Sequence, residues 1–79
     1  MHRNKRNWSM IGPRIHQMRL QKNVSPEELC AKLQGAGIEL CPQELLSVEA
    51  QKRRVLDFEL IAFMKVLDVS ASWLMGKES

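Results

Sequence analysis

The chain has 79 residues, of which 44% are hydrophobic and 27% are charged. This length suits one small domain, and the composition is typical of a folded globule rather than a disordered chain. The longest stretch without a charge, Val69 to Gly76, is far below the roughly 20 apolar residues of a membrane span. The basic start is followed by too short an apolar run for a signal peptide. We therefore expect a single cytoplasmic domain, whose small size disfavours an enzyme.

Charge is distributed unevenly along the chain, whose net charge is +3. Residues 1–22 hold six basic residues and no acidic one, whereas residues 23–49 hold five glutamates and one lysine. A second basic cluster follows at Lys52, Arg53 and Arg54. Clustered positive charge is typical of nucleic-acid binding, although a solvated charged face produces the same pattern. Charge alone leaves both interpretations open.

Caps and apolar spacing predict five helices and no strand. The clearest start is Ser25-Pro26-Glu27-Glu28, with a serine N-cap, a proline at the first helical position and a glutamate that closes a capping box. Cys41-Pro42-Gln43-Glu44 repeats the proline and the glutamate of this pattern. The predicted helices run from Pro13 to Asn23, from Ser25 to the break at Gln34–Gly37, from Pro42 to Glu49, from a cap at Asp57 to Leu67, and from Ala71 to Met75.

The same spacing predicts which side chains form the core. Leu46 falls outside the apolar face of its helix, so we expect it to be exposed. Four methionines are expected as core filler, namely Met10, Met18, Met64 and Met75. The other residues expected on inner faces are Ile11, Ile15, Leu20, Leu29, Leu33, Leu45, Val48, Leu60, Ile61 and Leu67.

The cysteines and histidines do not form a metal-binding pattern. His2, His16, Cys30 and Cys41 lack the close spacing of structural zinc ligands, so we expect neither a metal nor a cofactor. Two cysteines are also too few for a disulfide scaffold. Cys30 is expected to be a buried apolar filler. Cys41 begins a helix, where it is either an ordinary cap residue or a reactive thiol.

Five short segments together carry a family resemblance. They are Ile15–Arg19, Val24–Leu29, Leu45–Glu49, Asp57–Ile61 and Leu67–Leu74. In this order they resemble the Cro-repressor-type, XRE-like family of helix-turn-helix DNA-binding domains. The resemblance covers Ile11 to Gly76 and implies an all-α, compact five-helix bundle of the lambda-repressor-like type. The helices from Ser25 and from Pro42 would form the helix-turn-helix pair, with the second in the major groove.

The resemblance also implies structural roles at both ends of the domain. Arg19 matches the family's arginine in the first helix, and Glu49 matches its glutamate at the end of the recognition helix. These two residues typically form a salt bridge that ties the helices together. Trp73 and Leu74 match the apolar pair of the last helix, which closes the core or contributes to a dimer contact.

Base contacts are expected from the exposed face of the recognition helix. Gln43 and Ser47 are ordinary base readers. Glu44 can accept a hydrogen bond from a cytosine amino group, but its charge repels phosphates. Leu46 can contact a thymine methyl or a protein partner, or it is an exposed leucine without a function. Pro26 replaces the glutamine that commonly contacts phosphate, so this contact is lost. Phosphate contacts are therefore expected from Lys52, Arg53, Arg54 and the basic residues of the N-terminal arm, Arg3, Lys5 and Arg6.

These features predict a sequence-specific, non-catalytic transcriptional regulator that binds double-stranded DNA as a homodimer. Residues 1–8 form a basic flexible arm and residues 9–79 a single helix-turn-helix domain. The arm either lies along phosphates or in a minor groove, or it has no function. The alternative is a helix-turn-helix fold used as a protein–protein interaction module without DNA binding, because a fold does not determine a function.

Overall fold

The computed structural model describes residues 7–77, and within this range the chain forms helices and loops but no strand. A short 3-10 turn, η1 (Ser9–Ile11), precedes five α-helices. These are α1 (Gly12–Gln21), α2 (Pro26–Gly35), α3 (Pro42–Glu49), α4 (Asp57–Leu67) and α5 (Ala71–Leu74). The all-α prediction is therefore confirmed for the described part of the chain.

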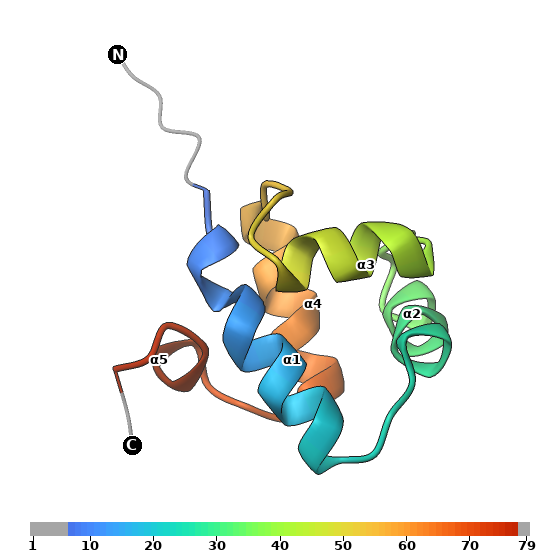
Figure 1. The fold of residues 1–79 in the computed structure, drawn as a ribbon, viewed down its shortest axis with the longest axis horizontal. Helices are drawn as coiled ribbons and strands as arrows, with labels where there is room; N and C mark the ends of the chain where they lie inside the picture. Colours follow the sequence, from blue (N-terminus) through green and yellow to red (C-terminus); the bar gives the residue numbers. More distant parts are fainter. Residues whose placement is uncertain (1–6, 78–79) are drawn as a thin grey trace.

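The helices pack around α1 and α4 (Figure 1). Figure 1 shows α1 in the middle of the view, with α3 above it, α2 on the right, α5 on the left and α4 behind. Contacts join α1 to α3, α4 and α5, and join α2 to both α3 and α4. Because every long helix touches at least two others, a single core lies between them.

The start of α2 follows the local hydrogen bonding expected of its sequence. Ser25 Oγ accepts a hydrogen bond from the Glu28 backbone N–H at 3.1 Å, and Glu28 Oε1 accepts one from the Ser25 N–H at 2.9 Å. The bond from the Ser25 N–H holds the pKa of Glu28 below its ordinary value. The helix continues through Gly35, beyond the start of the predicted break, and the chain turns at Gly37, whose φ is +90°. Only a glycine adopts this φ without strain.

Helices α3 and α4 begin with a similar device, a glutamate that accepts the N–H of the cap residue. Glu44 Oε1 accepts from the Cys41 N–H at 3.0 Å, and Glu59 Oε1 accepts from the Leu56 N–H at 3.0 Å. The predicted cap of α4 at Asp57 is therefore wrong by one residue. Leu56 is the cap residue and Asp57 is the first helical residue. The carboxylate that accepts the free N–H of Leu56 belongs to Glu59, two positions after Asp57.

The core consists mainly of the predicted residues, but three predicted residues are exposed and several buried ones, among them Phe63, were not predicted. Leu20, Ile61 and Met10 are exposed, whereas Phe63 is fully buried. Leu20 is one residue beyond Arg19 on α1, and each step turns the side chain by about 100° around the helix. The same step moves Ile61 off the face of α4 that buries Leu60, Ala62, Phe63 and Leu67. Cys30 is buried in the core, in agreement with its expected role as apolar filler.

Candidate nucleic-acid interface

Helix α3 presents part of its surface to solvent because its opposite face is fixed in the core. Leu45 and Val48 are fully buried, while α3 packs against both α1 and α2. Gln43 and Leu46 are exposed and Ser47 is half-buried on the outer side. The structure therefore brings together three of the four residues that the sequence predicts as base contacts, on one short helix.

The fourth residue, Glu44, is exposed but is already engaged within its own helix. Its Oε1 accepts the Cys41 backbone N–H, and this bond holds the pKa of Glu44 below its ordinary value. The carboxylate is thus ionised and directed toward the start of α3. Its role in this structure is to cap the helix, and its charge adds to the acidic surroundings.

Helices α1 and α3 approach each other unusually closely at Gly12. A Cβ atom at this position would lie 2.1 Å from the Val48 carbonyl oxygen and 3.0 Å from that of Glu49. Real Cβ atoms do not approach backbone oxygen so closely, so the absence of a side chain allows the start of α1 to rest on the last turn of α3. This contact helps to fix the position of the whole candidate interface.

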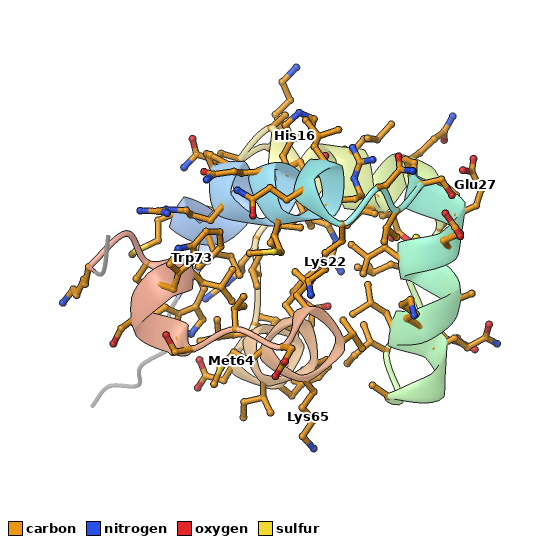
Figure 2. The ribbon with its side chains drawn as sticks, turned by 90° about the horizontal axis from the view of Figure 1, so that it is seen from below. His16, Lys22, Glu27, Met64, Lys65 and Trp73 are labelled. Carbon is orange, nitrogen blue, oxygen red and sulfur yellow. The ribbon has the colours of Figure 1, made fainter. Side chains whose placement is uncertain are left out.

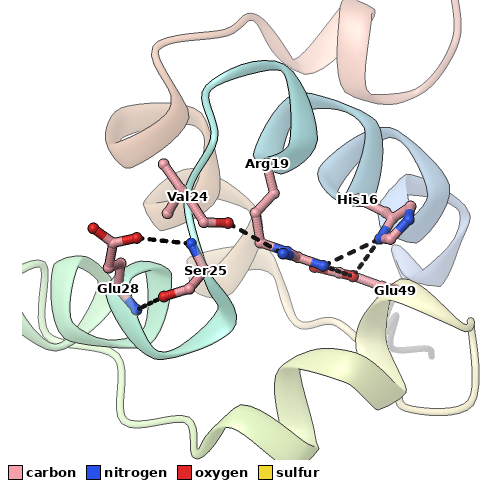
Figure 3. A network of polar contacts seen from close by, with 6 residues as sticks. All are labelled: His16, Arg19, Val24, Ser25, Glu28 and Glu49. Atoms are coloured by element: carbon pink, nitrogen blue, oxygen red, sulfur yellow. Dashed lines mark hydrogen bonds and ion pairs between the residues drawn. The ribbon is translucent and has the colours of Figure 1, made fainter.

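A buried ion pair joins the same two helices near the C-terminal end of α1 (Figure 3). The Nε of Arg19 donates to Glu49 Oε2 at 2.8 Å, and its Nη2 donates to Oε1 at 3.0 Å. The Arg19 and Glu49 side chains are only 8% and 5% exposed. Arg19 Nη1 also donates to the Val24 carbonyl at 3.1 Å, which ties the α1–α2 connection to the pair. This is the pair that the family resemblance implies.

His16 is a third member of this network that the sequence reasoning missed. Its Nδ1 lies 2.7 Å from Glu49 Oε1 (Figure 3). Because a carboxylate ion only accepts hydrogen bonds, His16 donates to Glu49 in the tautomer that carries the proton on Nδ1. Burial opposes ionisation of Glu49, but the hydrogen bonds from Arg19 and His16 outweigh it, and its pKa lies below the ordinary value. His16 precedes Arg19 by three residues, and this helical spacing was the available signal.

The basic cluster after α3 divides into two kinds of residue. The sequence predicts Arg53, together with Lys52 and Arg54, as a phosphate contact. In the structure its guanidinium binds Glu59 through two bonds, Nη1 to Oε1 at 3.0 Å and Nη2 to Oε2 at 3.1 Å. These bonds raise the pKa of Arg53. Lys52 and Arg54 are exposed at the same loop. Arg53 therefore ties the loop between α3 and α4 to the start of α4.

The missed partner of Arg53, Glu59, is almost fully buried at the start of α4. Its Oε1 accepts from both Arg53 and the Leu56 N–H, so one carboxylate serves the ion pair and the helix start. The signal that could have found it is the repeat of a glutamate at the third position of α2, α3 and α4.

The described chain begins beside this loop. Asn7 Oδ1 accepts from the Val55 N–H at 3.2 Å, and the Trp8 N–H donates to the Val55 carbonyl at 2.9 Å. The indole of Trp8 also donates to Asp57. Residues 1–6, which include Arg3, Lys5 and Arg6, lie outside the described part, and the described chain begins with bonds to Val55, the residue after Arg54.

Acidic side chains cluster between α2 and the start of α3, at the end of α3 opposite the α3–α4 loop. An open hollow of about 600 Å³ lies there, lined by Glu27, Glu39 and Glu44 together with both cysteines. Among residues 7–77 no group of histidine, cysteine and acidic side chains is arranged to hold a metal ion. Within the same range no helix is long and apolar enough to cross a membrane. The candidate interface is thus basic at the α3–α4 loop and acidic beside α2.

No protein family, curated protein or solved structure matches this chain in the comparisons made with known proteins.

Proposed function

We propose that this chain is a sequence-specific, non-catalytic DNA-binding regulator of the helix-turn-helix type, with α2 and α3 as the pair and α3 as the recognition helix. The observation that carries this proposal is the exposed face of α3, where Gln43, Leu46 and Ser47 lie at the surface while the helix is fixed from behind. A recognition surface must be rigid and must offer side chains that read base edges, and this face meets both requirements.

The proposed roles separate reading from positioning. Gln43 bonds adenine through its amide, Ser47 bonds a base edge through its hydroxyl, and Leu46 packs on a thymine methyl. Lys52 and Arg54 contact phosphates beside α3, together with the N-terminal arm that starts near the same loop. Arg53 positions the loop through its ion pair with Glu59, so we expect it to contribute less to phosphate binding than Lys52 and Arg54. The protein would bind a two-fold symmetric site as a homodimer.

The acidic side of the surface sets the expected strength of binding. Glu27, Glu39 and Glu44 repel phosphates, so few contacts are available and all of them lie toward the α3–α4 loop. We therefore expect a shallow dependence of the binding constant on salt concentration. Affinity should therefore be modest even at low salt and should fall only gradually toward physiological salt.

Fluorescence anisotropy with labelled duplex DNA, first random in sequence and then enriched by selection, tests this proposal. The double variant Lys52→Ala/Arg54→Ala should weaken binding to every sequence and reduce the salt slope by about two, roughly one per lost phosphate contact. Lys32→Ala is the matched control, since Lys32 is an exposed lysine on α2 away from this loop. It should leave the slope unchanged.

Gln43→Ala tests the reading role separately. It should relax discrimination at one base pair, at a cost of about 1 to 3 kcal/mol, while the salt slope stays nearly unchanged. No binding at low salt, or binding that none of these changes affects, would reject the DNA proposal.

The acidic hollow beside α2 favours one second candidate function, a module that binds another protein. A surface with three glutamates around Leu40 and Pro42 complements a basic protein segment better than a phosphate backbone. In that case the charge reversal Glu27→Lys/Glu39→Lys should abolish partner binding without unfolding the chain, because both side chains line the hollow and are exposed. The DNA assay decides between the two candidates, since only the first predicts a salt-dependent complex with bare duplex.

A further inference from the structure

Helix α4 carries an apolar stripe on the side that faces away from the core. Phe58 and Ile61 are 58% and 51% exposed, and Met64, which is half-buried and packs partly against the core, lies one turn beyond Ile61. Asp57, whose carboxylate also accepts the Trp8 indole N–H, and Lys65 flank these three residues and are both exposed. Figure 2 shows Lys65 pointing away from the bundle, on the opposite side of the molecule from His16. We call these five residues the α4 stripe.

The α4 stripe is symmetric in its chemistry about Ile61. Asp57 precedes Ile61 by four residues and Lys65 follows it by four, while Phe58 and Met64 lie three residues before and after it. If two copies of α4 lie antiparallel with Ile61 at the centre, Asp57 of each copy faces Lys65 of the other. Phe58 of each copy likewise faces Met64. The helix dipoles then also run in opposite directions, which is favourable.

We propose that the α4 stripe is the contact surface for a second copy of this chain, in an antiparallel, two-fold pairing of α4 centred on Ile61. A two-fold contact must be self-complementary, and the stripe satisfies this requirement for both its apolar and its charged residues. One helix face from each copy buries less than the area of a standard interface, so the dimer is weak and depends on concentration. This pairing does not rest on the proposed function and can be tested without DNA.

Sedimentation equilibrium of the full chain over a wide concentration range tests the pairing. The wild-type chain should show a reversible monomer–dimer equilibrium. Ile61→Asp should weaken dimerisation by about tenfold or more, because it places a charge at the centre of the contact. Leu20→Asp is the matched control, since Leu20 is 59% exposed but lies on α1. It should dimerise like the wild type. A chain that is monomeric at all concentrations overturns the proposal, as does an equal effect of both variants.

Charge reversal tests the antiparallel register. Lys65→Glu and Asp57→Lys each place like charges opposite each other, so each variant alone should dimerise more weakly than the wild type. An equimolar mixture should recover dimers, because both pairs are then of opposite charge. Circular dichroism checks that each variant folds. Should Asp57→Lys fail to fold, a deficit of Lys65→Glu that shrinks at high salt supports the same register. Absence of recovery in the mixture of two folded variants would overturn it.

Discussion

Removing one partner of the Arg19–Glu49 pair is expected to destabilise this protein severely. Arg19→Met keeps the aliphatic part of the side chain and removes the guanidinium, and Glu49→Gln keeps the shape of the carboxylate and removes its charge. Because the two side chains are 8% and 5% exposed, either change leaves the other charge buried without its counter-charge. Two short bonds between Arg19 and Glu49 are affected in both cases.

The magnitude follows from this burial. Removing one partner of a buried ion pair costs about 3 to 5 kcal/mol. A domain of this length has a free energy of unfolding of roughly 4 to 12 kcal/mol, at 0.05 to 0.15 kcal/mol per residue. Either single change therefore removes a large part of the stability and brings the chain close to unfolding. The double variant strands no charge, so its loss should be smaller than the sum of the two single losses.

Urea unfolding followed by circular dichroism measures these losses in a double-mutant cycle. We expect the double variant to lose at least about 1 kcal/mol less than the sum, within the range found for residues in contact. The Arg53→Met/Glu59→Gln cycle is a matched comparison. The Arg53 side chain is 29% exposed, so its coupling to Glu59 should be smaller. Additivity of Arg19→Met and Glu49→Gln within about 0.5 kcal/mol would refute the reasoning.

Three further predictions concern local features of the fold. Gly12→Ala should destabilise the fold by about 1 to 3 kcal/mol in thermal unfolding, because the new Cβ meets the Val48 carbonyl. The control is Gly35→Ala, whose Cβ has no atom within 4 Å, and it should be neutral or stabilise the fold by up to about 1 kcal/mol. Equal effects of the two changes would refute the contact at Gly12. The folded-state pKa of Glu49 is below its ordinary value of 4.5, so the stability from this group is present above that pH and is lost as pH falls through the lower value. The unfolding free energy of Glu49→Gln should therefore change less in that acid range than the unfolding free energy of the wild type. Identical pH profiles of the two proteins would contradict this. Ser25→Ala removes the serine half of a capping box and should cost about 1 kcal/mol in the same urea assay, whereas an unchanged midpoint would show that the cap contributes nothing.

The starts of the helices could be predicted from the sequence because they depend on hydrogen bonds between neighbours in the chain. Ser25 with Glu28, and Cys41 with Glu44, form their bonds within one turn, so a short segment contains all the necessary information. The same holds for Ser70, whose side chain caps α5. For this reason the observed starts lie within one residue of the predicted ones.

Burial and pairing were decided by the tertiary structure. The apolar residues of a helix can lie on more than one of its faces, and the sequence does not show which face is buried. Only the neighbouring helices determine that Phe63 is buried while Leu20 and Ile61 remain exposed. A basic residue in a cluster likewise has no partner until the chain folds. Arg53 meets Glu59 only because the α3–α4 loop turns back onto the start of α4. The helices are thus properties of local sequence, whereas the chemistry of the candidate interface depends on contacts between residues far apart in the chain.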